Sequence, residues 1–267
     1  MRRIALGVSY DGKPWLGWQT QPGGLTVQDQ LQAALAHFVG TPVQTTCAGR
    51  TDTGVHALGQ VVHIDVTVDR PESAWVRGLN SFLPDSIAVQ WAREVSTDFH
   101  ARFSATSRSY VYLLLNSTVR QPLWAGKAGW CFRRLDLEQM QRGADLLIGE
   151  HDFSSFRSSQ CQAATPVRTM HQICLRRQGD MVLFKLTANA FLHHMVRNIV
   201  GELVLLGQGK TDLAHFERVF KSLDRSQAAP TYSASGLYLT DVAYPEGLLF
   251  KPESTSLGSL FGLESSE

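Results

Sequence analysis

The sequence predicts an α+β protein made of two halves that both follow the order of a ferredoxin-like fold. Its 267 residues suffice for one large domain or two small ones with a substantial core. Segments with strand-like alternation and segments with helical spacing of apolar residues succeed one another along the chain. In the first half their order is strand, helix, two strands, helix, strand, which is typical of a split βαβ unit.

The first half, residues 1–100, is expected to contain four strands and two helices. Thr26 can cap the first helix and Gly40 can end it, whereas Pro84 ends the second. The expected strands are Ile4–Tyr10, Val43–Cys47, Val61–Val68 and Ile87–Glu94, and the expected helices start at Thr26 and cover Glu72–Phe82.

The second half, residues 101–250, repeats this coarse order without visible sequence repetition. Asp136 can cap a helix, and Gln178–Asp180 can form the turn of a hairpin. The expected strands are Ser109–Leu115, Val167–Arg177, Met181–Ala188 and Leu237–Tyr244, and the other expected helices are Ala190–Leu206 and Asp212–Leu223. Residues 251–267 are dominated by Ser, Gly and Glu and are expected to be a disordered tail.

Composition excludes several classes of protein. No run of about 18 apolar residues occurs, so no membrane-spanning helix is expected. The first residues, MRRIALGVSYDG, lack the apolar core and cleavage site of a secretory signal. Four cysteines form no CxxC pair, so a disulfide framework and a cysteine zinc site are not expected. A reducing cytoplasm fits these features best.

The basic residues permit binding to nucleic acid without demanding it. Six of the 25 are lysines and the other 19 are arginines, although the net charge is only +1. Residues 1–240 carry 24 basic and 19 acidic residues, because the acids concentrate toward the end of the chain. Arginine binds phosphate through two parallel N–H groups and stacks on bases.

The most informative segment is Gly49–Ala57, which reads GRTDTGVHA between two apolar strands. Its glycines allow tight turns and close approach of a bulky ligand. Asp52 lies two residues from the guanidinium of Arg50, so it could be presented to a substrate as a carboxylate. The alternative is that Asp52 only caps a turn, and spacing alone favours that alternative.

Two further segments carry candidate binding residues. Alternation places Arg108, Tyr110 and Tyr112 on one face of a strand, where a tyrosine could stack on a base or simply pack in the core. Arg197 lies in a mostly apolar helix, so it either extends to solvent or pairs with a carboxylate.

Other catalytic patterns are incomplete in this sequence. Gly207–Thr211 resembles a phosphate loop, but Val204 stands where the first glycine is required. His193 and His194 are adjacent instead of four residues apart, so a zinc helix is unsupported and no metal is expected. No GxSxG elbow indicates a serine hydrolase.

The loop Gly49–Ala57 resembles the signature loop of the TruA-type tRNA pseudouridine synthases. The resemblance covers nearly the whole chain through ordered motifs, with a small departure in the first loop at 13–16. These motifs are Tyr10-Asp11-Gly12, Gly17-Trp18-Gln19, Thr26-Val27-Gln28, Arg102–Tyr112, Phe191–Gly201 and Leu237-Tyr238-Leu239.

The resemblance implies an isomerase that converts uridine to pseudouridine at positions 38, 39 and 40 of the tRNA anticodon stem–loop. It implies the pseudouridine synthase fold: two ferredoxin-like halves with a central antiparallel sheet, helices on one side and a cleft between the halves. A homodimer, tRNA as the partner and no cofactor are also implied, with neither DNA nor membrane involved.

By the same resemblance, Asp52 matches the catalytic nucleophile and Tyr110 the tyrosine that contacts the base. Arg50 and Arg197 match arginines near the catalytic carboxylate. The chemistry agrees, because a single carboxylate suffices to attack the sugar or the base. A guanidinium such as that of Arg197 would keep this carboxylate ionised. The main rival hypothesis is an RNA-binding module without catalysis, in which Asp52 would be structural.

Overall fold

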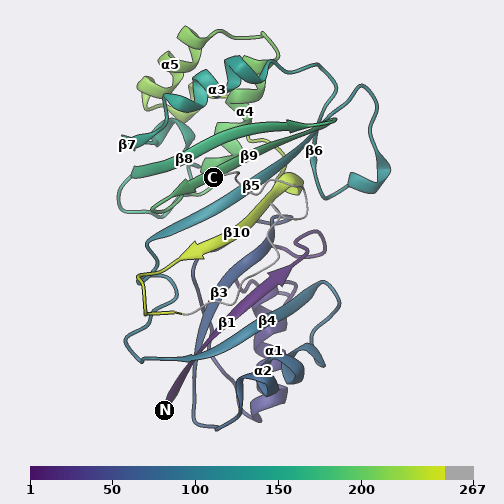
Figure 1. Cartoon of the computed structure of the whole chain (residues 1–267), viewed down its shortest axis with the longest axis vertical. Helices are drawn as coiled ribbons and strands as arrows, with labels where there is room; N and C mark the ends of the chain where they lie inside the picture. The colour runs from purple at the N-terminus through teal and green to yellow at the C-terminus, as the bar shows by residue number, and fades with distance from the viewer. Residues whose placement is uncertain (250–267) are drawn as a thin grey trace. The chain divides into compact units, whose positions relative to one another are not determined.

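A computed structural model describes residues 1–249 (Figure 1). The chain forms two compact units. Unit 1 comprises Met1–Thr106 and the segment that starts at Leu239, and unit 2 comprises Ser107–Tyr238. The sequence placed the division at residue 100 and assigned 239–250 to the second half. The expected tail, 251–267, lies outside the described residues.

Unit 1 is built on a sheet with the strand order β4-β1-β3-β10. The central strand β1 (Arg2–Tyr10) pairs antiparallel with both β3 (His56–Val66) and β4 (Ile87–Val95). The short β2 (Thr46–Cys47) pairs with β3, and β10 covers Leu237–Ala243. Because β10 follows β3 in the sheet, the end of the described chain completes the unit in which the chain begins.

The first helix of unit 1 forms where the sequence predicts it. The Thr26 side chain accepts a hydrogen bond from the Asp29 N–H, and α1 (Val27–Val39) ends at Gly40, whose φ of 87° suits glycine. Val27, Leu31, Ala34 and Leu35 are buried on one face of this helix. The second helix, α2 (Glu72–Asn80), packs on β4.

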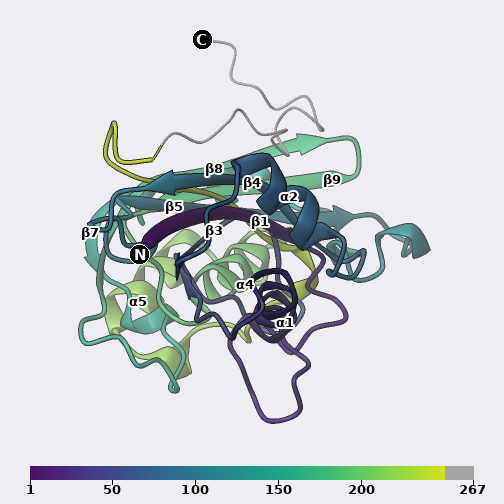
Figure 2. The same cartoon turned by 90° about the horizontal axis from the view of Figure 1, so that it is seen from below.

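Unit 2 has the strand order β5-β9-β8-β7, with antiparallel pairing throughout this path. Its strands are β5 (Ser107–Asn116), β6 (Gly129–Cys131), β7 (Gly149–Asp152), β8 (Val167–Gln178) and β9 (Met181–Ala188). Its helices are α3 (Leu137–Asp145), α4 (Met195–Gly207) and α5 (Leu213–Ser222), with 3-10 turns η1 (Pro122–Trp124), η2 (Ser154–Phe156), η3 (Arg225–Gln227) and η4 (Ala234–Gly236). Figure 2 shows α4 and α5 on the same side of β8 and β9.

The α+β class is confirmed, but several elements differ from the prediction. The strand β6 runs parallel to β5, so the sheet is mixed instead of antiparallel. Both β6 and β7 were missed, since three or four residues carry too little alternation to be detected. The helix α4 starts at Met195 and not at Ala190, because His194 adopts a left-handed conformation with φ of 64°. No helix in the described part of the chain has the length and apolarity needed to cross a bilayer.

His63 makes the stability of unit 1 sensitive to acid. This side chain is 6% exposed, and its Nδ1 accepts a hydrogen bond from the Ala101 N–H at 3.1 Å. Burial lowers the pKa of His63 from 6.5 to about 4, with the charges of Arg3 and His100 acting in the same direction and that of Asp65 opposing them. The unfolded chain therefore binds a proton between these two values that the native state does not bind.

We expect the free energy of unfolding to fall as the pH drops from 6.5 toward 4, because the unfolded state takes up the additional proton. Urea titrations at pH 7 and pH 5 measure this change. The variant His63→Gln should lose less stability than the wild type over the same interval, by about 1–2 kcal/mol. Equal losses in both proteins would remove His63 as the cause.

Candidate functional site

Asp52 lies in the loop between β2 and β3, at a position fixed by a tight turn. The Val55 N–H donates to the Asp52 carbonyl oxygen at 3.1 Å, and Gly54 at the third position of this turn has a φ of 79°. That angle matches a type II turn, which favours glycine there. The Asp52 side chain is half-buried, the neighbouring Thr51 is buried and Arg50 is exposed. The turn thus presents the carboxylate partly to solvent.

A second loop, residues 11–18, lies so close to the Asp52 loop that side chains would not fit between them. A Cβ added at Gly12 would overlap the Val55 carbonyl oxygen, and one added at Gly17 would lie 2.7 Å from the Thr51 carbonyl oxygen. The Trp18 N–H donates to that same Thr51 oxygen at 3.0 Å. The motifs Tyr10-Asp11-Gly12 and Gly17-Trp18-Gln19 therefore hold the backbone of the Asp52 loop.

Buried side chains also contact the Asp52 loop. The Tyr10 and Thr51 hydroxyl groups are hydrogen-bonded at 2.8 Å, and the Tyr10 ring packs against that of Trp18 with centroids 5.9 Å apart. Tyr10, Trp18 and Thr51 are 5%, 1% and 7% exposed. At the base of the loop, the Gln60 amide donates to the Gly49 carbonyl oxygen at 2.6 Å. Both ends of the loop are thereby tied to β1 and β3.

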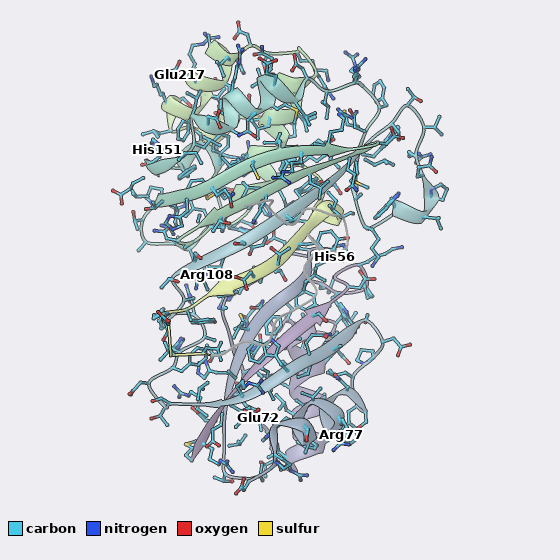
Figure 3. The ribbon with its side chains drawn as sticks, viewed as in Figure 1. His56, Glu72, Arg77, Arg108, His151 and Glu217 are labelled. Atoms are coloured by element: carbon cyan, nitrogen blue, oxygen red, sulfur yellow. The ribbon has the colours of Figure 1, made fainter. Side chains whose placement is uncertain are left out.

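His56 closes the loop at the start of β3 and is labelled in Figure 3. Its buried ring accepts a hydrogen bond from the Gly12 N–H at Nδ1, at 3.0 Å. The Asp11 carboxylate also lies 3.0 Å from Nδ1. Through these two contacts at Nδ1, the His56 ring joins the Asp52 loop to the loop of residues 11–18. The sequence contained His56 in the motif but gave no role for it.

Cys47 precedes the loop and is unsuited to act as its nucleophile. Burial raises the pKa of this thiol to about 11, although the positive charge of Arg50 acts in the opposite direction. A thiol with this pKa stays protonated near neutral pH, whereas the reactive form of cysteine is the thiolate. Asp52 remains the stronger candidate for covalent chemistry in this loop.

In unit 2, alternation along β5 directs Arg108, Tyr110 and Tyr112 to one face, as predicted: they pair with Ala188, Leu186 and Phe184 of β9. Tyr110 is 8% exposed, and its ring meets that of Phe191 edge-on at 5.0 Å. Arg108, labelled in Figure 3, donates to the Asn189 carbonyl oxygen at 3.0 Å.

Tyr112 has the packing role that the sequence left open for tyrosines of this strand. It is fully buried, and its hydroxyl group donates to the Ser233 carbonyl oxygen at 2.8 Å. The ring lies against Gly129 and Gly236, where any Cβ would collide with it. Tyr112 therefore holds β6 and η4 against β5.

Arg197 lies in the first turn of α4 and is half-buried. Its Nε donates to the Tyr232 carbonyl oxygen at 2.9 Å, and the Tyr232 N–H donates back to the Arg197 carbonyl oxygen at 3.2 Å. The guanidinium is thus oriented by the backbone and does not simply extend to solvent. Of the four candidates, Arg50 and Asp52 belong to unit 1, and Tyr110 and Arg197 to unit 2.

The chain is similar to known proteins over most of its length. Residues 7–104 and 144–245 match the family model described as tRNA pseudouridine synthase, and these segments include Arg50, Asp52 and Arg197 but not Tyr110. A protein named tRNA pseudouridine synthase A from Bordetella petrii is 59% identical over 247 residues, which are 92% of each chain. Proteins of the same name from Herminiimonas arsenicoxydans (58% over 247 residues, 91% of this chain and 90% of that one) and Paraburkholderia xenovorans (57% over 246 residues, 92% and 91%) are also similar.

The Tyr10–Thr51 hydrogen bond gives a prediction about the rigidity of the Asp52 loop. Tyr10→Phe and Thr51→Val should each lower the free energy of unfolding by about 1 kcal/mol, because a buried hydrogen bond is lost. The double variant should lose less than the sum of the two, since both substitutions remove the same bond. Urea denaturation of all four proteins measures this coupling. Strict additivity would show that the bond contributes nothing.

Proposed function

Because the chain belongs to the tRNA pseudouridine synthase family, we propose that it acts on uridines 38, 39 and 40 of the tRNA anticodon stem–loop with Asp52 as nucleophile. The family consists of isomerases that act on tRNA. One observation supports the assignment of Asp52 above all others. The neighbouring loop 11–18 and several buried side chains hold the backbone around this half-buried carboxylate.

The proposed reaction needs one nucleophile and no net redox change. The N1–C1′ bond of uridine breaks, the uracil turns, and a C5–C1′ bond forms while the C5 proton leaves and N1 gains a proton. A carboxylate can form a transient bond to C1′ or to C6 and is released unchanged. Attack at C1′ and attack at C6 both need Asp52 as a carboxylate. The residues around Asp52 therefore do not distinguish one route from the other.

The other three residues are proposed to bind the substrate. A base inside a stem has to be extruded before it can react, and an aromatic ring can replace its stacking partners. Tyr110 suits this purpose because Phe191 fixes its ring edge-on. Arg50 and Arg197 are proposed to contact phosphates near the reacting nucleotide. We propose that the enzyme acts as a homodimer in the cytoplasm.

The first test concerns Asp52. Unmodified tRNA carrying tritium at uridine C5 should release label when incubated with the wild-type protein, because the C5 proton leaves during isomerisation. Asp52→Asn keeps the size of the side chain and should lower the rate by at least about a thousandfold, since the amide cannot act as the nucleophile. Thr53→Val, at the exposed neighbouring position, is the matched control and should stay close to wild-type activity.

Release of label by Asp52→Asn at the wild-type rate would falsify the nucleophile assignment. A wild-type protein that binds tRNA without releasing any label would instead support the RNA-binding module.

The second test concerns Tyr110. Tyr110→Phe keeps the ring and its contact with Phe191 and removes only the hydroxyl group. We expect tRNA affinity within about twofold of wild type and turnover at least about tenfold slower, which corresponds to about 1.4 kcal/mol in the barrier. Single-turnover rates and filter-binding constants separate the two effects. If affinity collapses together with thermal stability, Tyr110 has only a packing role.

A further inference from the structure

The connection between β5 and α3 carries an exposed surface that the proposed site does not use. It spans residues 117–135, includes η1 and β6, and in Figure 1 forms the teal loop that projects beside β6. The segment contains four basic residues and no acidic ones. It also falls in the interval 105–143, outside the residues that match the family model.

Two aromatic rings, Trp130 in β6 and Phe132 directly after it, are exposed. Gly129 and Cys131 are buried, and the Tyr112 ring occupies the place where a Gly129 side chain would stand. Trp130 and Phe132 alternate with them and are 39% and 56% exposed. Their ring centroids lie 6.0 Å apart at an interplanar angle of 42°. Two neighbouring exposed aromatic rings are unusual on a surface that is not a binding site.

Each of the two rings has an arginine over it. The Arg120 guanidinium carbon lies 5.9 Å from the Trp130 centroid, and that of Arg133 lies 5.7 Å from the Phe132 centroid. Both arginines are exposed. At these distances the positive charge is attracted to the ring face, which keeps each guanidinium beside its ring. We call Arg120, Trp130, Phe132 and Arg133 the aromatic–arginine surface.

Hydrogen bonds to the backbone hold this surface in place. The Tyr232 hydroxyl donates to the Trp130 carbonyl oxygen at 3.0 Å, and the Asn116 amide donates to the Cys131 and Arg133 carbonyl oxygens at 3.0 and 2.6 Å. The Trp130 indole N–H donates to the Ser117 carbonyl oxygen at 2.9 Å. A surface fixed in this way loses little conformational entropy when it binds a ligand.

We propose that the aromatic–arginine surface is a second RNA-binding site, which holds unpaired nucleotides of the tRNA substrate. Unpaired bases stack on aromatic rings and on guanidinium planes, and the arginines neutralise the adjoining phosphates. The proposal rests on the tRNA substrate of the proposed function. It concerns residues that take no part in the reaction at Asp52.

The charges of the segment favour RNA over a protein partner. The segment has no acidic residue among its four basic residues, which are Arg120, Lys127, Arg133 and Arg134. A further guanidinium, that of Arg177 in β8, donates a hydrogen bond to the Asn116 side-chain oxygen. The nearest acid along the chain, Asp136, accepts the Gln139 N–H as the cap of α3. Aromatic residues and arginine occur in both kinds of interface, but a segment with four basic residues and no acidic one matches the negative charge of a phosphate backbone.

Binding of full-length unmodified tRNA to the whole protein tests this proposal. Trp130→Ala combined with Phe132→Ala should raise Kd about tenfold through loss of stacking. Arg120→Glu combined with Arg133→Glu changes only exposed side chains, so folding is preserved. It should raise Kd and reduce the slope of log Kd against log salt by about two, one for each lost phosphate contact. The turnover number at saturating tRNA should stay within about twofold of wild type.

Matched controls lie elsewhere on the surface. Phe82 of unit 1 is 51% exposed, and Arg218 is exposed on α5. Phe82→Ala and Arg218→Glu should leave Kd unchanged. Photo-crosslinking of tRNA that contains 4-thiouridine should label peptides from residues 117–135 in the wild type, which a purely structural role for this segment would not produce.

The proposal fails if both double variants bind tRNA with the wild-type Kd and salt slope while Asp52→Asn remains inactive; the proposed function then stands without it. It also fails if sedimentation shows that the variants lose a dimer and crosslinks avoid residues 117–135. The surface would then contact a second copy of the chain. If the wild type releases no tritium, the proposed function fails. Crosslinks between tRNA and residues 117–135 would even then show that this surface contacts RNA, and their absence would contradict the proposal.

Discussion

The arrangement around Asp52 depends on the close approach of two backbone segments. At Gly12 and Gly17 the chain passes so near the Asp52 loop that the carbonyl groups of Val55 and Thr51 occupy the space of a side chain. The hydrogen bonds from Trp18 and Gly12 require this proximity. These backbone contacts leave the Asp52 side chain half-buried and partly open to solvent.

The candidate residues of unit 2 are positioned by different means. Tyr110 owes its direction to the alternation of β5, which also directs Tyr112 into the core. Arg197 owes its place to the late start of α4, where His194 adopts a left-handed conformation that costs about 1 kcal/mol for a residue with a side chain. The paired hydrogen bonds between Arg197 and Tyr232 help to offset this cost. Strain of this kind is often retained where it orients a functional group.

The strand β5 carries both Tyr110 of the proposed site and Tyr112, which packs behind the aromatic–arginine surface. Tyr112 excludes any side chain at Gly129, and Trp130, the next residue of β6, points to solvent. Its neighbour Tyr110 lies two residues away on the same face of β5. A substitution of Tyr112 would therefore disturb the packing of β5 near Tyr110 as well as the aromatic–arginine surface. The exposed residues of that surface can be substituted without changing this core.

The sequence by itself determined the elements whose signals are local. The cap at Thr26, the glycine that ends α1 and the turn at 178–180 each depend on a few adjacent residues and appear in the structure as predicted. The loop that begins at Gly49 is also present, but β3 starts at His56 and therefore earlier than the expected strand Val61–Val68. Tertiary structure alone decided the rest. The short strands β6 and β7 form only because they pair with longer strands, and β10 joins the unit in which the chain begins. Gly12 and Gly17 are required by contacts with residues about 35 to 45 positions away. Local propensity cannot encode such contacts, because their energy arises only when distant segments meet.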